Sequence, residues 1–355
     1  MAGIARLLIG VSAILVMAGN AHVAARSTRP FQPAPGHLSL MTYNVQGLPW
    51  PLASGRPTAM VAIASRLRAM RLANRQPEVV ALQEAFGDDA KAIGRSAGYR
   101  YMAVGPGAAD GSTLALNAAD RRFLVRGSML DGEGIGKRLD SGLVIFSDYP
   151  IAAVRRIVYP VCAGYDCLAN KGALAVTILG PGGQPVAVLN THLNSGHASG
   201  VPKPRRYYAY GRQIAQVAAF AAAIEATGVP LLLAGDFNVG HDPARRRAFG
   251  AWLASARSAP GVAASACRAD PGCSLMATPS LAESLHRAKD WLMYRSSTTT
   301  RIRPTVISVP FGRERDRTML SDHIGIAASY LLEPLRAVGV RLARKAAPHP
   351  PGARA

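Results

Sequence analysis

The sequence has few aromatic and few acidic residues, and no second long apolar run. Aromatic residues make up 6% of the 355 residues, and 21 Asp and Glu stand against 41 Lys and Arg. Beyond residue 25 no stretch of about 18 apolar residues occurs, which excludes an ordinary transmembrane helix there. Polar low-complexity tracts are also missing, and 49% of the residues are hydrophobic. The composition therefore fits one large α/β domain or two modest ones rather than a disordered chain.

Both ends of the chain are expected to lie outside the folded domain. Arg6, the apolar run Leu7 to Met17 and the small residues Val23 to Ala25 predict a signal peptide over residues 1–25. A secreted or periplasmic protein follows from it, with an uncleaved N-terminal anchor as the alternative. We expect a flexible lead-in at 26–36, one folded domain at 37–332 and a basic, Pro-rich tail at 333–355.

The four cysteines form two close pairs in loop-like sequence: Cys162 with Cys167, and Cys267 with Cys273. Export to an oxidising compartment favours disulfides. Three connectivities exist, and we predict pairing between sequence neighbours. The spacing does not match a zinc site.

The net charge of +20 has two interpretations. It could attract polyanions or anionic membrane surfaces. Alternatively, the Arg residues are spread over a solvated surface, because they are scattered rather than clustered in the sequence. Charge alone does not decide the function.

Short apolar runs alternate with helical patterns along the domain. Helices are predicted at Pro57–Ala73 and at Arg205–Ala226, where Ile214, Val217, Ala218, Ala221 and Ile224 form one apolar face. Predicted strands are Leu38–Gln46, Val79–Gln83, Tyr99–Val104, Gly142–Phe146, Ile151–Val158, Ala173–Leu179, Val186–Leu193, Leu231–Ala234, Trp291–Tyr294, Ile302–Ser308 and Ile324–Leu331. Many strands with few helices indicate stacked sheets with helices outside.

Polar side chains with metal-binding or acid–base chemistry follow or precede several of these strands. They are Asn44, Glu84, His192, Asn194, Asp236, Asn238, Asp322 and His323. Strand ends that meet at one sheet edge would satisfy these groups together. Carboxylate and amide oxygens suit Mg²⁺, and such a cluster could position a water and stabilise a phosphate transition state.

Each of these residues also has an ordinary structural explanation. Asn44 and Asn238 could be turn residues, and Glu84 could be an acid at a helix N-terminus. Asp322 could cap a strand, and a lone His at a strand end is often structural. These separate explanations account poorly for the occurrence of all these residues together, in this order along the chain.

The ordered motifs resemble the endonuclease/exonuclease/phosphatase superfamily. They are Asn44, Gln83-Glu84, Thr191-His192-Leu193, Gly235-Asp236-Phe237-Asn238 and Ser321-Asp322-His323. The resemblance spans about residues 38–331 and implies a four-layer α/β sandwich of two stacked mixed β-sheets flanked by helices.

The same resemblance implies a role for each motif residue. Glu84 would hold Mg²⁺ with help from Asn44, and Mn²⁺ or Co²⁺ would be substitutes. Asp236 and Asn238 would position the attacking water and the phosphate, which His192 would stabilise. The general base would be His323, because an unperturbed histidine side chain titrates near neutral pH. Asp290 resembles the acid that orients this base, and Asp322 the acid directly before it.

The middle of the chain resembles the neutral sphingomyelinases more narrowly. Ser141 to Ile151 matches one of their blocks. Asp166 and Lys171 match a pair that acts in those enzymes as a switch near the active site. Taken without the resemblance, the pair would be a surface ion pair of little value to stability.

The sequence departs from this family at two places. Asn194-Ser195-Gly196-His197 replaces the usual acidic run after the His motif, and residues 278–284 show no evident membrane-dipping apolar hairpin. These departures leave another choline phospholipid or a lysophospholipid open as the substrate.

The resemblance implies a phosphoric diester hydrolase of the phospholipase C type that converts sphingomyelin to ceramide and phosphocholine. We expect a monomer that acts on a phospholipid membrane surface in preference to nucleic acid. A secreted nuclease on the same scaffold is the alternative, which the positive charge favours. A binding protein that has lost catalysis is a third class, disfavoured because every catalytic position holds the expected residue type.

Overall fold

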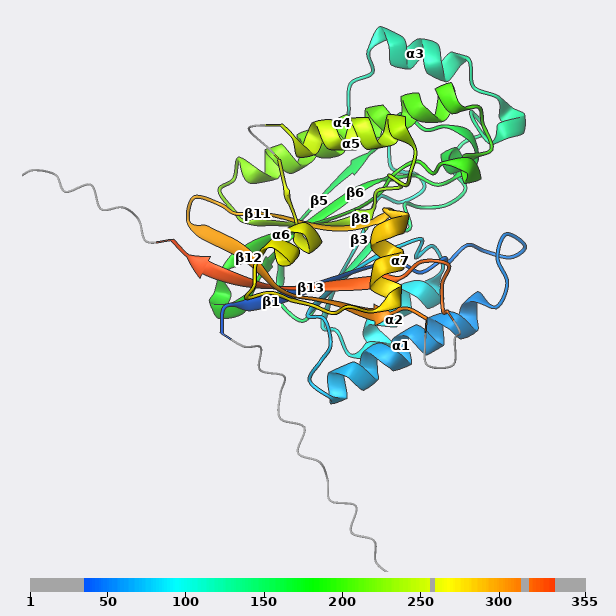
Figure 1. Cartoon of the computed structure of the whole chain (residues 1–355). Helices are drawn as coiled ribbons and strands as arrows, with labels where there is room; N and C mark the ends of the chain where they lie inside the picture. The colour runs from blue at the N-terminus through cyan, green and yellow to red at the C-terminus, as the bar shows by residue number, and fades with distance from the viewer. Residues whose placement is uncertain (1–34, 256–258, 314–318, 336–355) are drawn as a thin grey trace, which may run out of the picture. The chain divides into compact units, whose positions relative to one another are not determined.

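The computed structural model of the chain describes residues 35–255, 259–313 and 319–335. Two mixed β-sheets lie face to face within these residues, with helices on their outer faces (Figure 1). The expected four-layer α/β sandwich is confirmed. The predicted signal peptide at 1–25, nearly all of the lead-in at 26–36 and nearly all of the tail at 333–355 lie outside the described residues.

The first sheet has the strand order β10-β12-β13-β1-β2-β4-β3, and the second has the order β5-β6-β7-β8-β11-β9. The strands are β1 (His37–Asn44), β2 (Val79–Gln83), β3 (Tyr101–Val104), β4 (Val144–Ser147), β5 (Ile151–Val158), β6 (Gly172–Leu179), β7 (Pro185–His192), β8 (Leu231–Asp236), β9 (Gly261–Val262), β10 (Ser274–Leu275), β11 (Asp290–Arg295), β12 (Thr300–Phe311) and β13 (Gly325–Pro334). The helices are α1 (Arg56–Leu72), α2 (Asp88–Ala97), α3 (Ala118–Val125), α4 (Lys203–Glu225), α5 (Pro243–Leu253), α6 (Ala263–Ala269) and α7 (Pro279–Arg287). β13 continues past the predicted domain boundary at 332.

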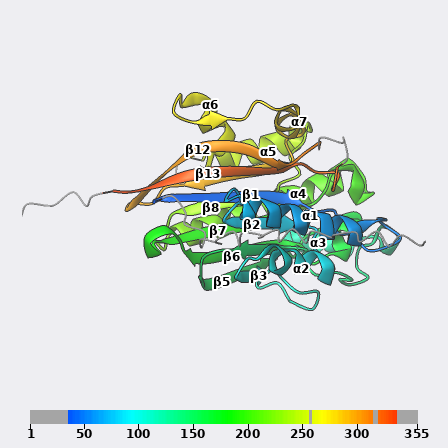
Figure 2. The same ribbon diagram turned by 90° about the horizontal axis from the view of Figure 1, so that it is seen from below.

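Three apolar layers hold the sandwich together. The central layer joins the facing sheets through fully buried residues such as Leu40 and Val79 on one side and Val188 and Leu232 on the other. One outer layer packs α1 and α2 on the first sheet, and another packs α4 and α5 on the second. In Figure 2, α6 and α7 lie beside β12.

Helix α4 shows how the local sequence produces this packing. Ile214, Val217, Ala221 and Ile224 recur at three- and four-residue spacing and are all buried. Ala218, the fifth residue of the predicted face, is partly buried against the same layer, so the apolar face is confirmed.

The structure also settles three smaller questions. Both predicted disulfides form, Cys162–Cys167 and Cys267–Cys273. The segment at 278–284 lies mostly within α7 rather than in a hairpin. No helix in the described part of the chain combines the length and hydropathy that a membrane span requires.

Candidate active site

The strand topology brings the predicted residues to one edge of the two sheets. β1 and β2 are parallel, and so are β7 and β8. The carboxyl ends of parallel strands share an edge, so Asn44, Glu84, His192 and Asp236 meet there. β11 is antiparallel to β8, and its first residue Asp290 therefore lies opposite Asp236.

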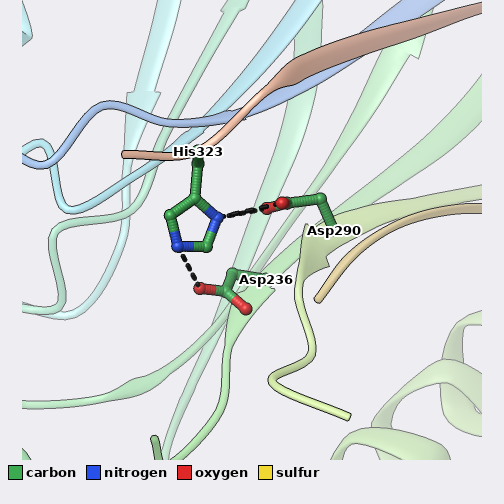
Figure 3. A group of neighbouring side chains, drawn as sticks. All are labelled: Asp236, Asp290 and His323. Carbon is green, nitrogen blue, oxygen red and sulfur yellow. Dashed lines mark hydrogen bonds and ion pairs between the residues drawn. The ribbon is translucent and has the colours of Figure 1, made fainter. Parts of the chain in front are cut away.

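His323 precedes β13, whose start lies at this edge because β13 is antiparallel to β1. Its Nδ1 lies 2.9 Å from Oδ2 of Asp290, and its Nε2 lies 3.7 Å from Oδ2 of Asp236 (Figure 3). All three side chains are buried. Burial opposes the charged imidazole, but the carboxylates of Asp290 and Asp236 outweigh it and raise the pKa of His323 to about 9. This arrangement suits a histidine general base whose imidazole ring is oriented by a carboxylate at Nδ1.

Glu84 offers the clearest position for a divalent cation. Its Oε1 accepts from Nδ2 of Asn44 at 2.8 Å. No hydrogen bond or ion pair within residues 35–255, 259–313 and 319–335 reaches Oε2, and the residue lines a pocket. Burial raises the pKa of this carboxyl group. An anionic oxygen without a cationic contact in a recessed site fits Mg²⁺.

Asn44 reaches the site as a hydrogen-bond donor. Its Nδ2 donates to Glu84 and also to Oδ2 of Asp236 at 3.2 Å, while its Oδ1 accepts from the Gln46 backbone at 2.9 Å. The amide thus holds the two carboxylates in place.

A second grouping that could hold a metal consists of Asp236, Asp290 and His323, whose ligand atoms lie within 4.8 Å of one another. Both nitrogens of His323 already face carboxylates. Mg²⁺ also prefers oxygen ligands, so Glu84 is the better candidate for it.

His192 and Lys171 lie beside this cluster. Nζ of Lys171 is 3.1 Å from Nε2 of His192, and Nε2 is 3.5 Å from Oδ2 of Asp236. Burial and the Lys171 charge lower the pKa of His192 to about 3, so the imidazole is neutral. Lys171 also forms a buried ion pair with Asp166.

Asp166 is held by the segment that follows β7. Its Oδ2 accepts from Nδ2 of Asn194 at 3.2 Å, and from the backbone and hydroxyl of Ser195. Oδ1 of Asn194 accepts from the Ala163 backbone at 2.8 Å. Asn194 therefore joins the end of β7 to the loop that carries Asp166.

Two predicted residues occupy less central positions. Asn238 donates to the Leu193 carbonyl at 3.0 Å, and its backbone donates to Oδ1 of Asp236. Asp322 is exposed, and its carboxylate lies 3.4 Å from the Ser321 hydroxyl, outside the cluster around His323.

The site opens into a pocket of about 480 Å³. Glu84, Lys171 and His192 line its polar part. Its apolar wall is formed by Leu48, Leu52, Phe86, Leu139, Tyr165 and Leu168.

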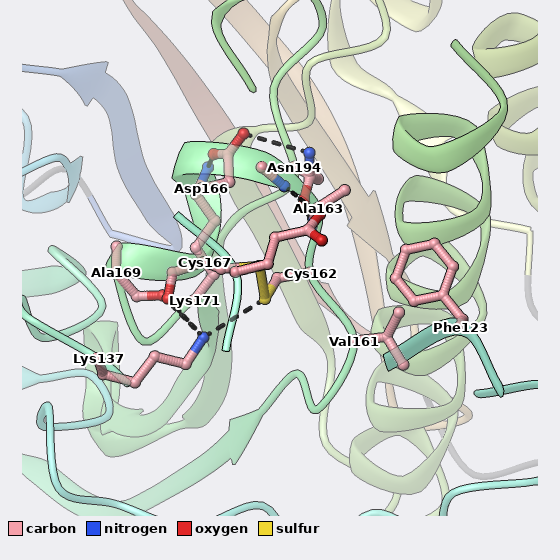
Figure 4. Close-up of a disulfide and its surroundings, with 12 residues drawn as sticks. Phe123, Lys137, Val161, Cys162, Ala163, Asp166, Cys167, Ala169, Lys171 and Asn194 are labelled. Atoms are coloured by element: carbon pink, nitrogen blue, oxygen red, sulfur yellow. Dashed lines mark hydrogen bonds and ion pairs between the residues drawn. A yellow bond between two sulfur atoms is a disulfide. The ribbon is translucent and has the colours of Figure 1, made fainter. Parts of the chain in front are cut away.

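The Cys162–Cys167 disulfide braces the loop that carries Asp166 (Figure 4). Nζ of Lys137 donates to the carbonyls of Cys167 at 2.9 Å and Ala169 at 3.3 Å. Burial lowers the pKa of Lys137 to about 8. A disulfide and a half-buried amine thus fix the conformation of the Asp166 segment.

Sequence reasoning missed two groups that support the site. Arg245 on α5 is buried and donates to the carbonyls of Asn194, Ser195 and Asn238, which holds the ends of β7 and β8 together. Gln83 and Asn190 bridge the two sheets, with Nε2 to Oδ1 at 2.7 Å. Gln83 entered the sequence analysis only as part of the Gln83-Glu84 motif, and the signal for Asn190 was a polar residue within an apolar strand.

Comparison with curated proteins finds sphingomyelinases. The sphingomyelinase of Mycobacterium bovis is 26% identical over an alignment of 241 positions that covers 64% of this chain and 38% of that protein. The sphingomyelinase of Mycobacterium tuberculosis matches equally. The chain thus spans well under half the length of these relatives.

Comparison with solved structures finds the same fold at low identity. The beta toxin of Staphylococcus aureus, with bound magnesium ions, has a TM-score of 0.55 at 17% identity and covers 82% of this chain and 98% of its own. Sphingomyelinase C of Streptomyces griseocarneus has a TM-score of 0.54 at 22% identity, covering 82% and 99%. TDP2 of D. rerio, complexed with a single-strand DNA product, has a TM-score of 0.53 at 15% identity, covering 83% and 98%.

The family model of the Endonuclease/Exonuclease/phosphatase family matches residues 41–336. This match takes in both sheets and every strand end of the site, and the chain therefore belongs to the endonuclease/exonuclease/phosphatase family.

Proposed function

We propose that the protein is an exported, Mg²⁺-dependent phosphodiesterase that cleaves sphingomyelin, or a related choline phospholipid, to ceramide and phosphocholine. The observation that carries the proposal is the buried Asp166–Lys171 ion pair beside His192, in the pocket that Glu84 also lines. The two disulfides accord with an oxidising compartment. The enzyme would act as a monomer at a phospholipid surface.

His323 takes the proton in this proposal. A water molecule attacks phosphorus, and its proton passes to Nε2 of His323. The bond from phosphorus to the ceramide oxygen breaks, and that oxygen leaves with the bonding electron pair and takes up a proton from solvent. Asp290 holds Nδ1 of the imidazole and stabilises the charge that forms. Asp236 faces the same Nε2 and would orient the attacking water. Asn238, whose backbone donates a hydrogen bond to Asp236, would position the phosphate.

Glu84 would hold the metal ion, and Asn44 would orient the Glu84 carboxylate. When bound, Mg²⁺ neutralises charge on the phosphate and stabilises the leaving oxygen. His192 and Lys171 line the same pocket and would add hydrogen bonds and positive charge around the phosphate.

The apolar wall of the pocket favours a lipid over nucleic acid. Leu48, Leu52, Phe86 and Leu139 lie next to the polar residues, where the ceramide part would enter. The nuclease alternative is supported by the net charge of +20, since phosphate neutralisation dominates nucleic-acid affinity.

Phosphocholine release from sphingomyelin vesicles, with Mg²⁺ and with a chelator, tests the proposal beside a duplex DNA digest. We expect metal-dependent phosphocholine release and intact DNA. His323→Ala should abolish release while keeping the native circular dichroism spectrum. His286→Ala, which removes an exposed histidine, is the matched control and should stay active.

DNA cleavage with inert vesicles would move the function to a nuclease. An active and folded His323→Ala variant would remove His323 from the mechanism.

A further inference from the structure

Large apolar side chains stand exposed around the mouth of the active-site pocket. Residues 49–52, Pro-Trp-Pro-Leu, follow Leu48 and are all exposed, with Trp50 at 83% and Leu52 at 67%. Leu48, Pro49 and Leu52 line the pocket itself. A second pocket of about 460 Å³ shares Leu48 and Pro49 with it and includes Trp50.

A second exposed segment lies on another part of this mouth. The ring of Tyr165, a pocket residue that is 52% exposed, fits between Gly132 and Gly200, where an added Cβ would meet it at 3.1 and 2.8 Å. Met129 and Leu130 lie three and two positions before Gly132 and are 68% and 91% exposed. We call Pro49 to Leu52, Met129, Leu130 and Tyr165 the apolar rim.

Basic side chains accompany the apolar rim. Arg138 lines the pocket and is exposed, and within the described residues its guanidinium has no hydrogen bond or ion pair. Arg126, three positions before Met129, is likewise exposed and without such a partner there. The rim therefore combines apolar side chains with free positive charge.

We propose that the apolar rim is the surface on which the protein docks on a phospholipid bilayer. The inference rests on the proposed function, because a lipid phosphodiester at the bilayer surface reaches the pocket only if the pocket mouth contacts that surface. Trp and Tyr prefer the interface between lipid and water, and exposed apolar side chains bind by burial in it. Arg138 and Arg126 would complement lipid phosphates. The apolar rim is continuous with the active-site pocket, and Arg138 and Arg126 add positive charge to it. Both features favour a bilayer over a second protein as the partner of this surface.

Vesicle binding without turnover tests the rim directly. Proteins that carry His323→Ala are sedimented with sphingomyelin–phosphatidylcholine vesicles in the presence of a chelator. We expect Trp50→Ser with Leu130→Ser to weaken binding at least about tenfold, since two apolar contacts with the lipid are lost. Leu72→Ser is the matched control and should bind normally. Leu72 is 71% exposed at the far end of α1, a helix of 17 residues.

Tryptophan fluorescence locates the contact. The chain has three tryptophans, and Trp252 is buried while Trp291 is half-buried. A blue shift on adding vesicles therefore reports Trp50 and should vanish in Trp50→Phe, which still binds.

Unchanged vesicle binding by the double variant, or a blue shift that persists in Trp50→Phe, would overturn the inference. So would gel filtration that shows a dimer which the double variant converts to a monomer, because a second copy would then cover the rim. Normal vesicle binding without phosphocholine release by the unmutated chain would instead refute the proposed function and leave the docking surface standing.

Discussion

Nδ1 of His323 lies 2.9 Å from Oδ2 of Asp290, and the two residues belong to different sheets. Asp290 opens β11 of the second sheet, and His323 lies two residues before β13 of the first. The geometry of the proposed base is thus set by the packing of one sheet on the other. The central apolar layer and the Gln83–Asn190 bridge fix that packing.

Replacing the orienting carboxylate should slow the reaction and shift its pH dependence. We expect Asp290→Asn to lower kcat about 100- to 10,000-fold, the range typical of general acid–base catalysis. Removal of the Asp290 charge lowers the pKa of His323, which must be neutral to accept a proton. The acidic limb of the pH–rate profile should therefore move to lower pH. A variant with an unmoved acidic limb would contradict the role of Asp290.

Replacing the proposed metal ligand should abolish stabilisation by Mg²⁺. Binding to the folded state alone raises stability by about 2.7 kcal/mol at 100 times the dissociation constant. The Tm of the unmutated chain should rise with added Mg²⁺, and that of Glu84→Gln should not. Glu78→Gln is the control, since Glu78 is buried away from the pocket and accepts from Ser39.

Without metal, the same Glu84→Gln variant should be more stable than the unmutated chain at neutral pH. Burial raises the pKa of Glu84 above its unfolded value. Stability from this group is therefore present below the unfolded pKa and is lost as pH rises through the folded pKa. Chemical denaturation with a chelator at pH 7 and pH 4.5 measures the difference, which should shrink at the lower pH.

The site was predictable where a polar residue ends an apolar strand, because strand ends at a common edge need partners. Asn44, Glu84, His192 and Asp236 all followed this pattern. Its side-chain orientations were not predictable. Asn44 turns its amide nitrogen toward two carboxylates because the Gln46 backbone occupies its oxygen.

Much of the fold was predictable for the same reason, since its longer strands and helices carry clear apolar periodicity. Short β9 and β10 have only two residues each, too few for a pattern. From the sequence alone, Arg245 would be taken for a charged surface residue. Only the tertiary packing shows the three carbonyls to which it donates.

The Asp166–Lys171 pair should be tightly coupled. Both side chains are buried, at 8% and 5% exposure, and removing one partner leaves a buried charge. Asp166→Asn or Lys171→Met should each cost about 3–5 kcal/mol of unfolding free energy. The double variant should cost less than the sum, because neither charge is left alone. Denaturant unfolding of the four proteins measures the coupling, and additive losses would refute it.

The two disulfides should differ in their effect on activity but not on stability. Their sequence separations are 5 and 6 residues. Loop-closure entropy then gives each a similar contribution of about 2 kcal/mol. Cys162–Cys167 flanks Asp166, whereas Cys267 belongs to α6 and Cys273 immediately precedes β10.

We therefore expect Cys162→Ser with Cys167→Ser to lower phosphocholine release strongly, because the Asp166 segment loses its brace. Cys267→Ser with Cys273→Ser should lose a similar amount of stability and keep its activity at 25 °C. Measured Tm values and initial rates of both double variants separate the two effects. Equal losses of activity would mean that the first disulfide acts on the enzyme only through global stability, and that Lys137 and Asn194 suffice to hold Asp166 in place.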